Sequence, residues 1–203
     1  EKANPEHFIY FHDLYEGGGW APEGKLVGKG VFMPEQALNN PRNAQGNPVL
    51  FYSIGGWGME VGVNIETGEV KLMQAGGFYD AGRVINRKTC EGQIEGALSM
   101  GLGQAVFEEI MINDKGKVIN GNYRDYKVPT FMDSDVEMKI TLVEQAHPEG
   151  PYGVKGIGEP GLAPTAAAIV NAVCHACRTD FTSIPIKPEH ILFRKERGHA
   201  SEV

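Results

Sequence analysis

The segment from Gly153 to Gly161 reads GVKGIGEPG and combines closely spaced glycines with a lysine and a carboxylate. Residues 156–161 fit G-x-G-x-x-G, the pattern of a turn that holds the pyrophosphate of a dinucleotide at a helix N-terminus. Glu159 lies inside this pattern, and a carboxylate held within hydrogen-bond reach of a substrate proton can act as a general base. The segment is therefore compatible with a phosphate site, a structural turn with a solvated Glu159, or a catalytic loop.

The dinucleotide interpretation requires a strand before the glycines, a helix after them, and an acidic residue about 20 positions further on. A helix is predicted from Pro164 to about Cys177, and Asp180 lies near the required position. However, this helix leaves no room for the strand that should carry the acid, and residues 148–153 (PEGPYG) do not have the composition of a strand. A dinucleotide-binding protein remains an alternative that the neighbouring elements do not favour.

Two other groups of residues could bind a metal or carry out redox chemistry. Cys174 and Cys177 form a C-x-x-C at the C-terminal end of the predicted helix, where the helix dipole does not favour a thiolate. His175 projects away from Cys174, and no second ligand pair is present, so we interpret these cysteines as small buried side chains. His7 and His12, with the neighbouring Asp13, lack metal-ligand spacing, and we expect no metal ligand in this chain.

A long helix is predicted over residues 87–108, because four apolar residues recur along it at a spacing of four: Ile94, Leu98, Leu102 and Val106. Four glycines in the same segment each cost about 1 kcal/mol relative to alanine; they are Gly92, Gly96, Gly101 and Gly103. Close packing or a ligand against the helix must compensate for this cost. Gln93 lies beside Gly92, where the bare backbone would let a flat ligand approach its amide.

The remaining patterns predict an α+β fold, with helices packed on a mixed or antiparallel sheet in two lobes. We expect strands at 8–14, 49–54 and 136–144, with Gly55-Gly56 ending the second of these. Hairpins are predicted over 59–75 and 109–120, and a helical turn over 189–192. The expected organisation is a loop-rich segment over 1–48 that packs on, or is cut from, a longer subunit, a domain over 49–193, and a polar tail over 194–203.

Composition narrows the class of partner. The net charge is −7 and no basic stripe is present, so we expect neither nucleic acid nor an anionic membrane as a partner. The longest apolar run, near residues 163–176, is too short and too polar to cross a bilayer. Three cysteines without a secretory signal point to a reducing cytoplasm.

Several segments, in order and with matching spacings, resemble the molybdenum hydroxylase family of xanthine dehydrogenase, aldehyde oxidase and carbon monoxide dehydrogenase. The resemblance covers roughly residues 49–193 and is to the C-terminal part of the molybdopterin-binding large subunit. The segments that carry it are DAGRVIN (80–86), GQIEG (92–96), GLG (101–103), DYKVP (125–129), GVKGIGE (153–159), AAIVNA (167–172) and IPIKPE (184–189).

This resemblance implies a molybdopterin cofactor, in bacteria often as the cytosine dinucleotide form. It identifies Glu159 as the general base that takes the proton from a molybdenum-bound hydroxide, which attacks the substrate carbon while hydride passes to a sulfido ligand. Gln93 matches a glutamine that hydrogen-bonds the pterin. The backbone that packs around the cofactor corresponds to Lys155, Gly156, Ile157 and Gly158. Glycines allow such close approach, and burial favours proton uptake by a carboxylate.

The resemblance also implies partners. Large subunits of the family are several times longer, and their second glycine-rich cofactor loop and all iron-sulfur cysteine motifs are missing here. We therefore expect this chain to complete its site with the N-terminal portion of the large subunit, and to be inactive alone. Iron-sulfur clusters and FAD belong to other subunits or domains, and the substrate is a small aldehyde or N-heterocycle. A non-catalytic cofactor- or partner-binding subunit, or a simple interaction domain, remains an alternative.

Overall fold

The computed structural model describes residues 29–32, 40–46, 49 and 51–194. Contacts divide the chain into two compact units, Glu1–Glu35 and Gln36–Val203, and the elements below all belong to the second. The strand predicted at 8–14, the side chains of His7, His12 and Asp13, and all of the predicted tail except Arg194 lie outside the described residues.

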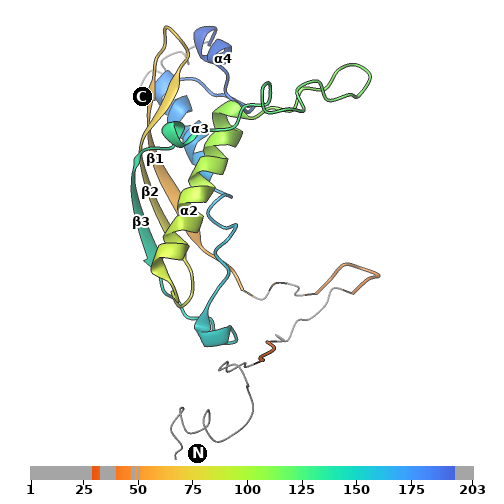
Figure 1. The fold of residues 1–203 in the computed structure, drawn as a ribbon, viewed down its shortest axis with the longest axis vertical. Helices are drawn as coiled ribbons and strands as arrows, with labels where there is room; N and C mark the ends of the chain where they lie inside the picture. The colour runs from red at the N-terminus through yellow and green to blue at the C-terminus, as the bar shows by residue number, and fades with distance from the viewer. Residues whose placement is uncertain (1–28, 33–39, 47–48, 50, 195–203) are drawn as a thin grey trace, which may run out of the picture. The chain divides into compact units, whose positions relative to one another are not determined.

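Three strands form one mixed sheet in the order β1-β2-β3 (Figure 1). They are β1 (Gly55–Val63), β2 (Val70–Asp80) and β3 (Glu137–Val143). β1 and β2 form the predicted antiparallel hairpin, whereas β3 runs parallel to β2. The mixed sheet with packed helices confirms the predicted α+β class.

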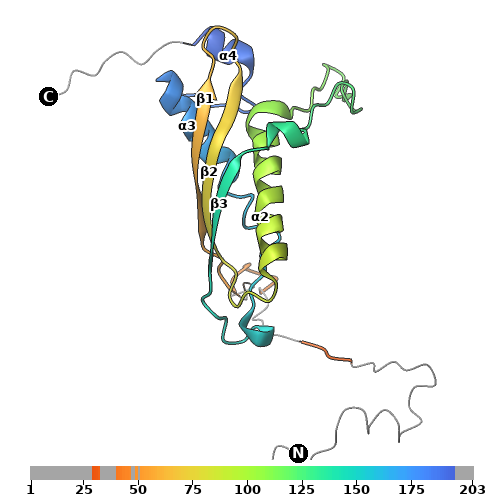
Figure 2. The same cartoon turned by 60° about the vertical axis from the view of Figure 1, so that its left-hand side comes forward.

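Two helices pack against one face of this sheet (Figures 1 and 2). They are α2 (Arg87–Leu102), which continues into the π-helical turn η1 (Gly103–Phe107), and α3 (Thr165–Cys177). Met59 and Val61 of β1 contact buried residues of both helices. On the opposite face of the sheet, Met73 and Phe78 are about half exposed. Three short helices complete the described part of the fold: η2 (Phe131–Asp133), η3 (Pro151–Gly153) and α4 (Pro188–Leu192).

The apolar stripe predicted on α2 forms much of the core. Ile94, Leu98 and Leu102 are at most 2% exposed, and they contact the sheet and α3. Only one face of the alanine-rich α3 is buried, with Thr165, Ile169, Val173 and Cys177. The reason is that α3 packs on β1 and α2 from one side only, and no described residue covers its outer face.

The strand predicted at 49–54 is wrong, because β1 begins at Gly55. Gly55 and Gly56 pair with Tyr79 and Phe78 of β2, which extends to Asp80. A Cβ atom on Gly55 would overlap the Tyr79 ring, so a residue type that usually interrupts strands is required here for close packing. The ladder ends where the Asp80 N–H donates to the Ile54 carbonyl at 2.8 Å, because the chain leaves the sheet after Asp80.

Residues 108–130 project from the end of η1 (Figure 1). The hairpin predicted over 109–120 is reduced to a single bridge between Ile112 and Val118. Tyr126 holds the base of this segment, donating its hydroxyl to Glu108 Oε2 at 2.6 Å. Among the described residues, no helix is long and apolar enough to cross a membrane.

Candidate functional site

The four costly glycines of α2 and η1 fall into two pairs. A Cβ on Gly101 would overlap Thr165 of α3, and one on Gly103 would overlap the Glu108 carboxylate. These two glycines are explained by packing within the chain. By contrast, Gly92 and Gly96 are exposed, and no described atom lies within 4 Å of a Cβ built on either. The free energy that these two glycines cost the helix is not offset by packing against any described residue.

The packing role of Gly101 is testable in the isolated chain. We expect Gly101→Ala to lower the free energy of unfolding by about 1–3 kcal/mol, because the added methyl overpacks the contact between α2 and α3. Urea denaturation measures this difference. An alanine variant as stable as the wild type would show that Thr165 can move away at no cost, and would remove the packing explanation for this glycine.

The segment 153–161 is joined at its first end to the residues that follow β2. Gly82 and Val154 form an antiparallel bridge. The Arg83 N–H donates to the Gly153 carbonyl at 2.8 Å, and the Lys155 N–H donates to the Ala81 carbonyl at 3.0 Å. Gly82 has a φ of +62°, and a Cβ there would lie 2.5 Å from the Gly153 oxygen. Two motifs about 70 positions apart in the sequence therefore form one structural unit.

A buried ion pair reinforces this junction. The Lys155 ammonium contacts Asp80 Oδ2, and the two side chains are 10% and 7% exposed. Asp80 Oδ1 also accepts the Gly82 N–H at 2.9 Å. Burial by itself would raise the pKa of Asp80, but the hydrogen bonds from Lys155 and Gly82 and the lysine charge outweigh it and hold this pKa below 3.8. The Lys155 side chain thus points into the protein, and its backbone continues toward the surface.

The other end of the segment is fixed at the Gly161 carbonyl. This oxygen accepts hydrogen bonds from Trp57 Nε1 at 3.0 Å, the Tyr79 hydroxyl at 3.2 Å and Thr165 Oγ1 at 2.6 Å. Burial raises the pKa of Tyr79 to about 12, despite an opposing hydrogen-bond contribution from Trp57, so its hydroxyl stays protonated and can donate. A Cβ on Gly161 would lie 2.9 Å from Ala97 Cβ, so the segment lies directly on α2.

Between its two fixed ends, the segment turns one side chain inward and leaves its glycines outside. Ile157 packs on the cluster of Tyr79, Ile94 and Leu142, whereas Gly156 and Gly158 are exposed. Within the part of the chain that the structure describes, the N–H groups of residues 156–159 donate to no backbone carbonyl. Backbone N–H groups without such an acceptor can donate to a ligand.

The structure brings the two predicted motifs together. A Cβ built on Gly158 would lie 3.7 Å from Gln93 Oε1, so the Gln93 amide lies beside the glycine loop. Gln93 and Glu159 are both exposed, so the described residues do not provide the burial expected to favour proton uptake by Glu159. We call the surface formed by Gly92, Gln93, Gly96 and residues 156–159 the glycine face. Four residues that hold the loop were not predicted from the sequence: Asp80, Trp57, Tyr79 and Thr165. The only signal was that Asp80 begins the segment DAGRVIN.

The geometry does not match a dinucleotide turn. An isolated bridge at Val154 and the short helix η3 precede the glycines, where a strand is required.

At the C-terminal end of α3, Cys177 is 3% exposed, and burial raises the pKa of its thiol. Cys174 Sγ accepts the Phe181 N–H at 3.3 Å. Among the described residues, no three His, Cys, Asp or Glu side chains are grouped so that they could hold a metal ion.

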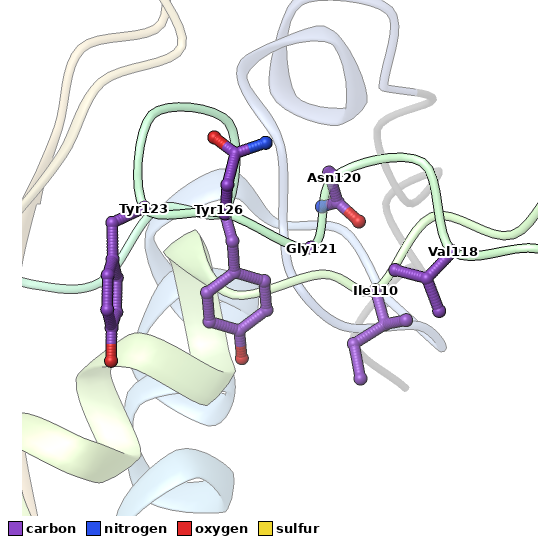
Figure 3. Close-up of a pocket in the computed structure, with 7 residues that line it drawn as sticks. Ile110, Val118, Asn120, Gly121, Tyr123 and Tyr126 are labelled. Atoms are coloured by element: carbon purple, nitrogen blue, oxygen red, sulfur yellow. The ribbon is translucent and has the colours of Figure 1, made fainter.

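A pocket of about 420 Å³ lies on the projecting segment (Figure 3). Tyr123, Tyr126 and Ile110 project to the same side of this segment (Figure 3). Its only strongly buried polar group, Asn120, is already bonded to Met111 N and the Glu109 carbonyl. The pocket contains no predicted site residue. It also offers a ligand no strongly buried polar group that lacks a hydrogen-bond partner.

The chain matches the model of the molybdopterin cofactor-binding domain over residues 6–135, which is more than half of its length. It belongs to this family. Gln93 lies inside the matched part of this molybdopterin cofactor-binding domain, and residues 155–159 lie beyond its end.

Among curated proteins, the domain is 36% identical over 134 residues to a putative xanthine dehydrogenase molybdenum-binding subunit of Escherichia coli (strain K12). It is also 36% identical over 135 residues to the aldehyde oxidoreductase molybdenum-binding subunit of the same organism. Each match covers 66% of this chain and 18% of the relative. The chain thus matches less than a fifth of the length of these relatives.

Two solved structures extend the comparison. The aldehyde oxidoreductase of Desulfovibrio gigas is 28% identical and superposes with a TM-score of 0.68, over 77% of this chain and 17% of that one. Quinoline 2-oxidoreductase of Pseudomonas putida 86 is 30% identical, with a TM-score of 0.62 over 66% and 18%. The fold is therefore that of a part of these oxidoreductases.

Proposed function

We propose that the glycine face binds the molybdopterin cofactor of a molybdenum hydroxylase, and that Glu159 is the general base beside it. The observation that carries the proposal is the position of the Gln93 amide against Gly158, with Glu159 next in the chain and exposed on the described part of the molecule. An amide, N–H groups without a backbone acceptor among the described residues, and a carboxylate thus share one surface.

The residues present fit such a group. A pterin is flat and rich in hydrogen-bonding atoms, so it requires clearance and donors. Gly92 and Gly96 leave the surface of α2 bare, and the N–H groups of residues 156–159 have no backbone acceptor among the described residues. When bound, the cofactor supplies the two-electron redox chemistry, which no side chain on this face provides.

The protein's own part in the reaction is to hold the cofactor and to move a proton. Gln93 donates or accepts through its amide, and the loop packs its bare backbone against the cofactor. The Glu159 carboxylate accepts the proton that leaves the attacking oxygen, and its exposure leaves it accessible to that group. Lys155 and Ile157 contribute through their side chains to the interior, and only their backbone reaches the face.

For the complete enzyme, we propose oxidative hydroxylation of an aldehyde or an N-heterocycle in the cytoplasm. The relatives named for xanthine, aldehyde and quinoline oxidation support this class of substrate. The N-terminal portion of the large subunit completes the site, the cofactor is the plain or cytosine dinucleotide form, and other chains or domains carry iron-sulfur clusters and FAD. The purified 203-residue chain alone oxidises no substrate, and turnover by it would contradict this proposal.

Gly92 and Gly96 allow a direct test in the isolated chain. If they serve an external ligand only, Gly92→Ala and Gly96→Ala each raise the free energy of unfolding by about 1 kcal/mol, the helix propensity of alanine over glycine. Urea denaturation measures the gain, and Gly101→Ala is the matched control on the same helix. A loss of stability in either variant would show that these glycines have a packing role inside the chain.

A further inference from the structure

The geometry points to Asp80 as a positioning residue: through its ion pair with Lys155, it sets the path of the loop that carries Glu159. This inference rests on the proposed role of Glu159. Asp80 itself is buried at the end of β2 and does not belong to the glycine face.

Among the described residues, the loop has few other polar constraints. The last backbone bond at its first end is from the Lys155 N–H to the Ala81 carbonyl. Beyond it, the next fixed backbone atom is the Gly161 oxygen, apart from a local turn in which the Leu162 N–H donates to the Glu159 carbonyl. In between, Ile157 contributes apolar packing only. The Lys155 side chain is thus the last polar attachment before Glu159, and it fixes the direction in which the chain leaves the bridge.

Asp80 is well suited to be the fixed partner. Asp80 pairs with Val143 of β3 in the sheet, and the Asp80 N–H donates to the Ile54 carbonyl at 2.8 Å. Its second carboxylate oxygen is bonded to the Gly82 N–H. The preceding residue, Tyr79, donates to the Gly161 carbonyl. Two consecutive residues of β2 therefore hold the two ends of the loop, and transmit the rigidity of the sheet to it.

Substitution of Asp80 or Lys155 alone would not separate an effect on loop position from an effect on stability, because it leaves the partner charge buried and unpaired. The double variant Asp80→Asn/Lys155→Met removes both charges, so neither charge is left buried without its partner. The matched control is Glu137→Gln/Lys139→Met, which neutralises a pair on β3 whose side chains are 66% and 72% exposed. Neither substitution of the control lies near the loop.

In the complete enzyme, we expect the Asp80→Asn/Lys155→Met variant to lower kcat by about 10-fold to 10²-fold, as for a misplaced catalytic group. KM should stay within about twofold, because Asp80 contacts no substrate, and kcat is measured per bound molybdenum, because the same loop also packs against the cofactor. In the 203-residue chain, amide exchange of Lys155 and Leu162 should become faster, since their N–H groups bond on either side of Glu159. The control should change none of these quantities.

The outcomes separate this inference from the general-base proposal. Wild-type kcat and amide exchange in the double variant, with Glu159→Gln inactive, would overturn the positioning role and keep the base. A loss of kcat explained by unfolding alone, with unchanged amide exchange below the melting temperature, would also overturn it. Asp80→Glu, which retains the charge, should retain more kcat than the double variant, and an equal loss would count against the ion pair.

Discussion

Glu159→Gln in the complete enzyme is expected to lower kcat by about 10²–10⁴-fold, the usual contribution of a general base. Glutamine keeps the size and one oxygen of the side chain but does not accept a proton at neutral pH. Because Glu159 is exposed and makes no ion pair among the described residues, the substitution should leave the fold unchanged. Steady-state turnover measures the loss.

Two accompanying measurements make this result specific. Molybdenum and pterin content should match the wild type, because Gln93 and the loop backbone remain in place. Glu149→Gln is a suitable control, since Glu149 is an exposed carboxylate on the preceding loop. Turnover within a few-fold of the wild type would contradict the general-base role of Glu159.

Asp80→Asn is expected to lower the free energy of unfolding of the chain by about 3–5 kcal/mol at pH 7, because the Lys155 charge remains buried without its partner. The pH dependence follows from the lowered pKa of Asp80 in the folded state. Between that pKa and the ordinary value of 3.8, the unfolded chain binds more protons than the folded one, so stability rises with pH.

The ion pair therefore stabilises the fold fully above pH 3.8, and its contribution is lost as the pH falls through the lowered pKa. Urea denaturation at pH 7 and at pH 3 should show the difference between wild type and Asp80→Asn shrinking at the lower pH. Glu137→Gln, at an exposed ion pair, should cost at most about 1 kcal/mol at either pH. An undiminished Asp80→Asn difference at pH 3 would contradict the assignment of the stabilisation to this charge.

Local pattern was sufficient to predict the main elements of the fold. The spacing of Ile94, Leu98 and Leu102 predicts α2, and the alternation along β1 predicts the hairpin. Local pattern does not predict that β1 begins at Gly55, because the need for glycine there comes from the Tyr79 ring on another strand. Likewise, the parallel pairing of β3 with β2 depends on how α2 crosses the sheet, which no local pattern contains.

The site was partly accessible in the same way. The motifs predict Gln93 and Glu159 as site residues, but only the fold shows that Gln93 lies against Gly158. The residues that hold the loop were missed because their partners are distant: Trp57 and Gly161 are 104 positions apart, and Asp80 and Lys155 are 75 apart. Such contacts connect otherwise ordinary residue types, so the sequence marks none of them apart from Asp80, which begins the segment DAGRVIN.

The central claim is that the glycine face binds the cofactor, and the cofactor content of a Gly92→Ala/Gly96→Ala complete enzyme tests it most directly. An added methyl in a tight contact costs about 1–3 kcal/mol, and 1.4 kcal/mol is tenfold in a binding constant. We therefore predict a molybdenum and pterin content of roughly a tenth of the wild type or less. Full cofactor content, in a variant that folds as well as the wild type, would contradict the claim.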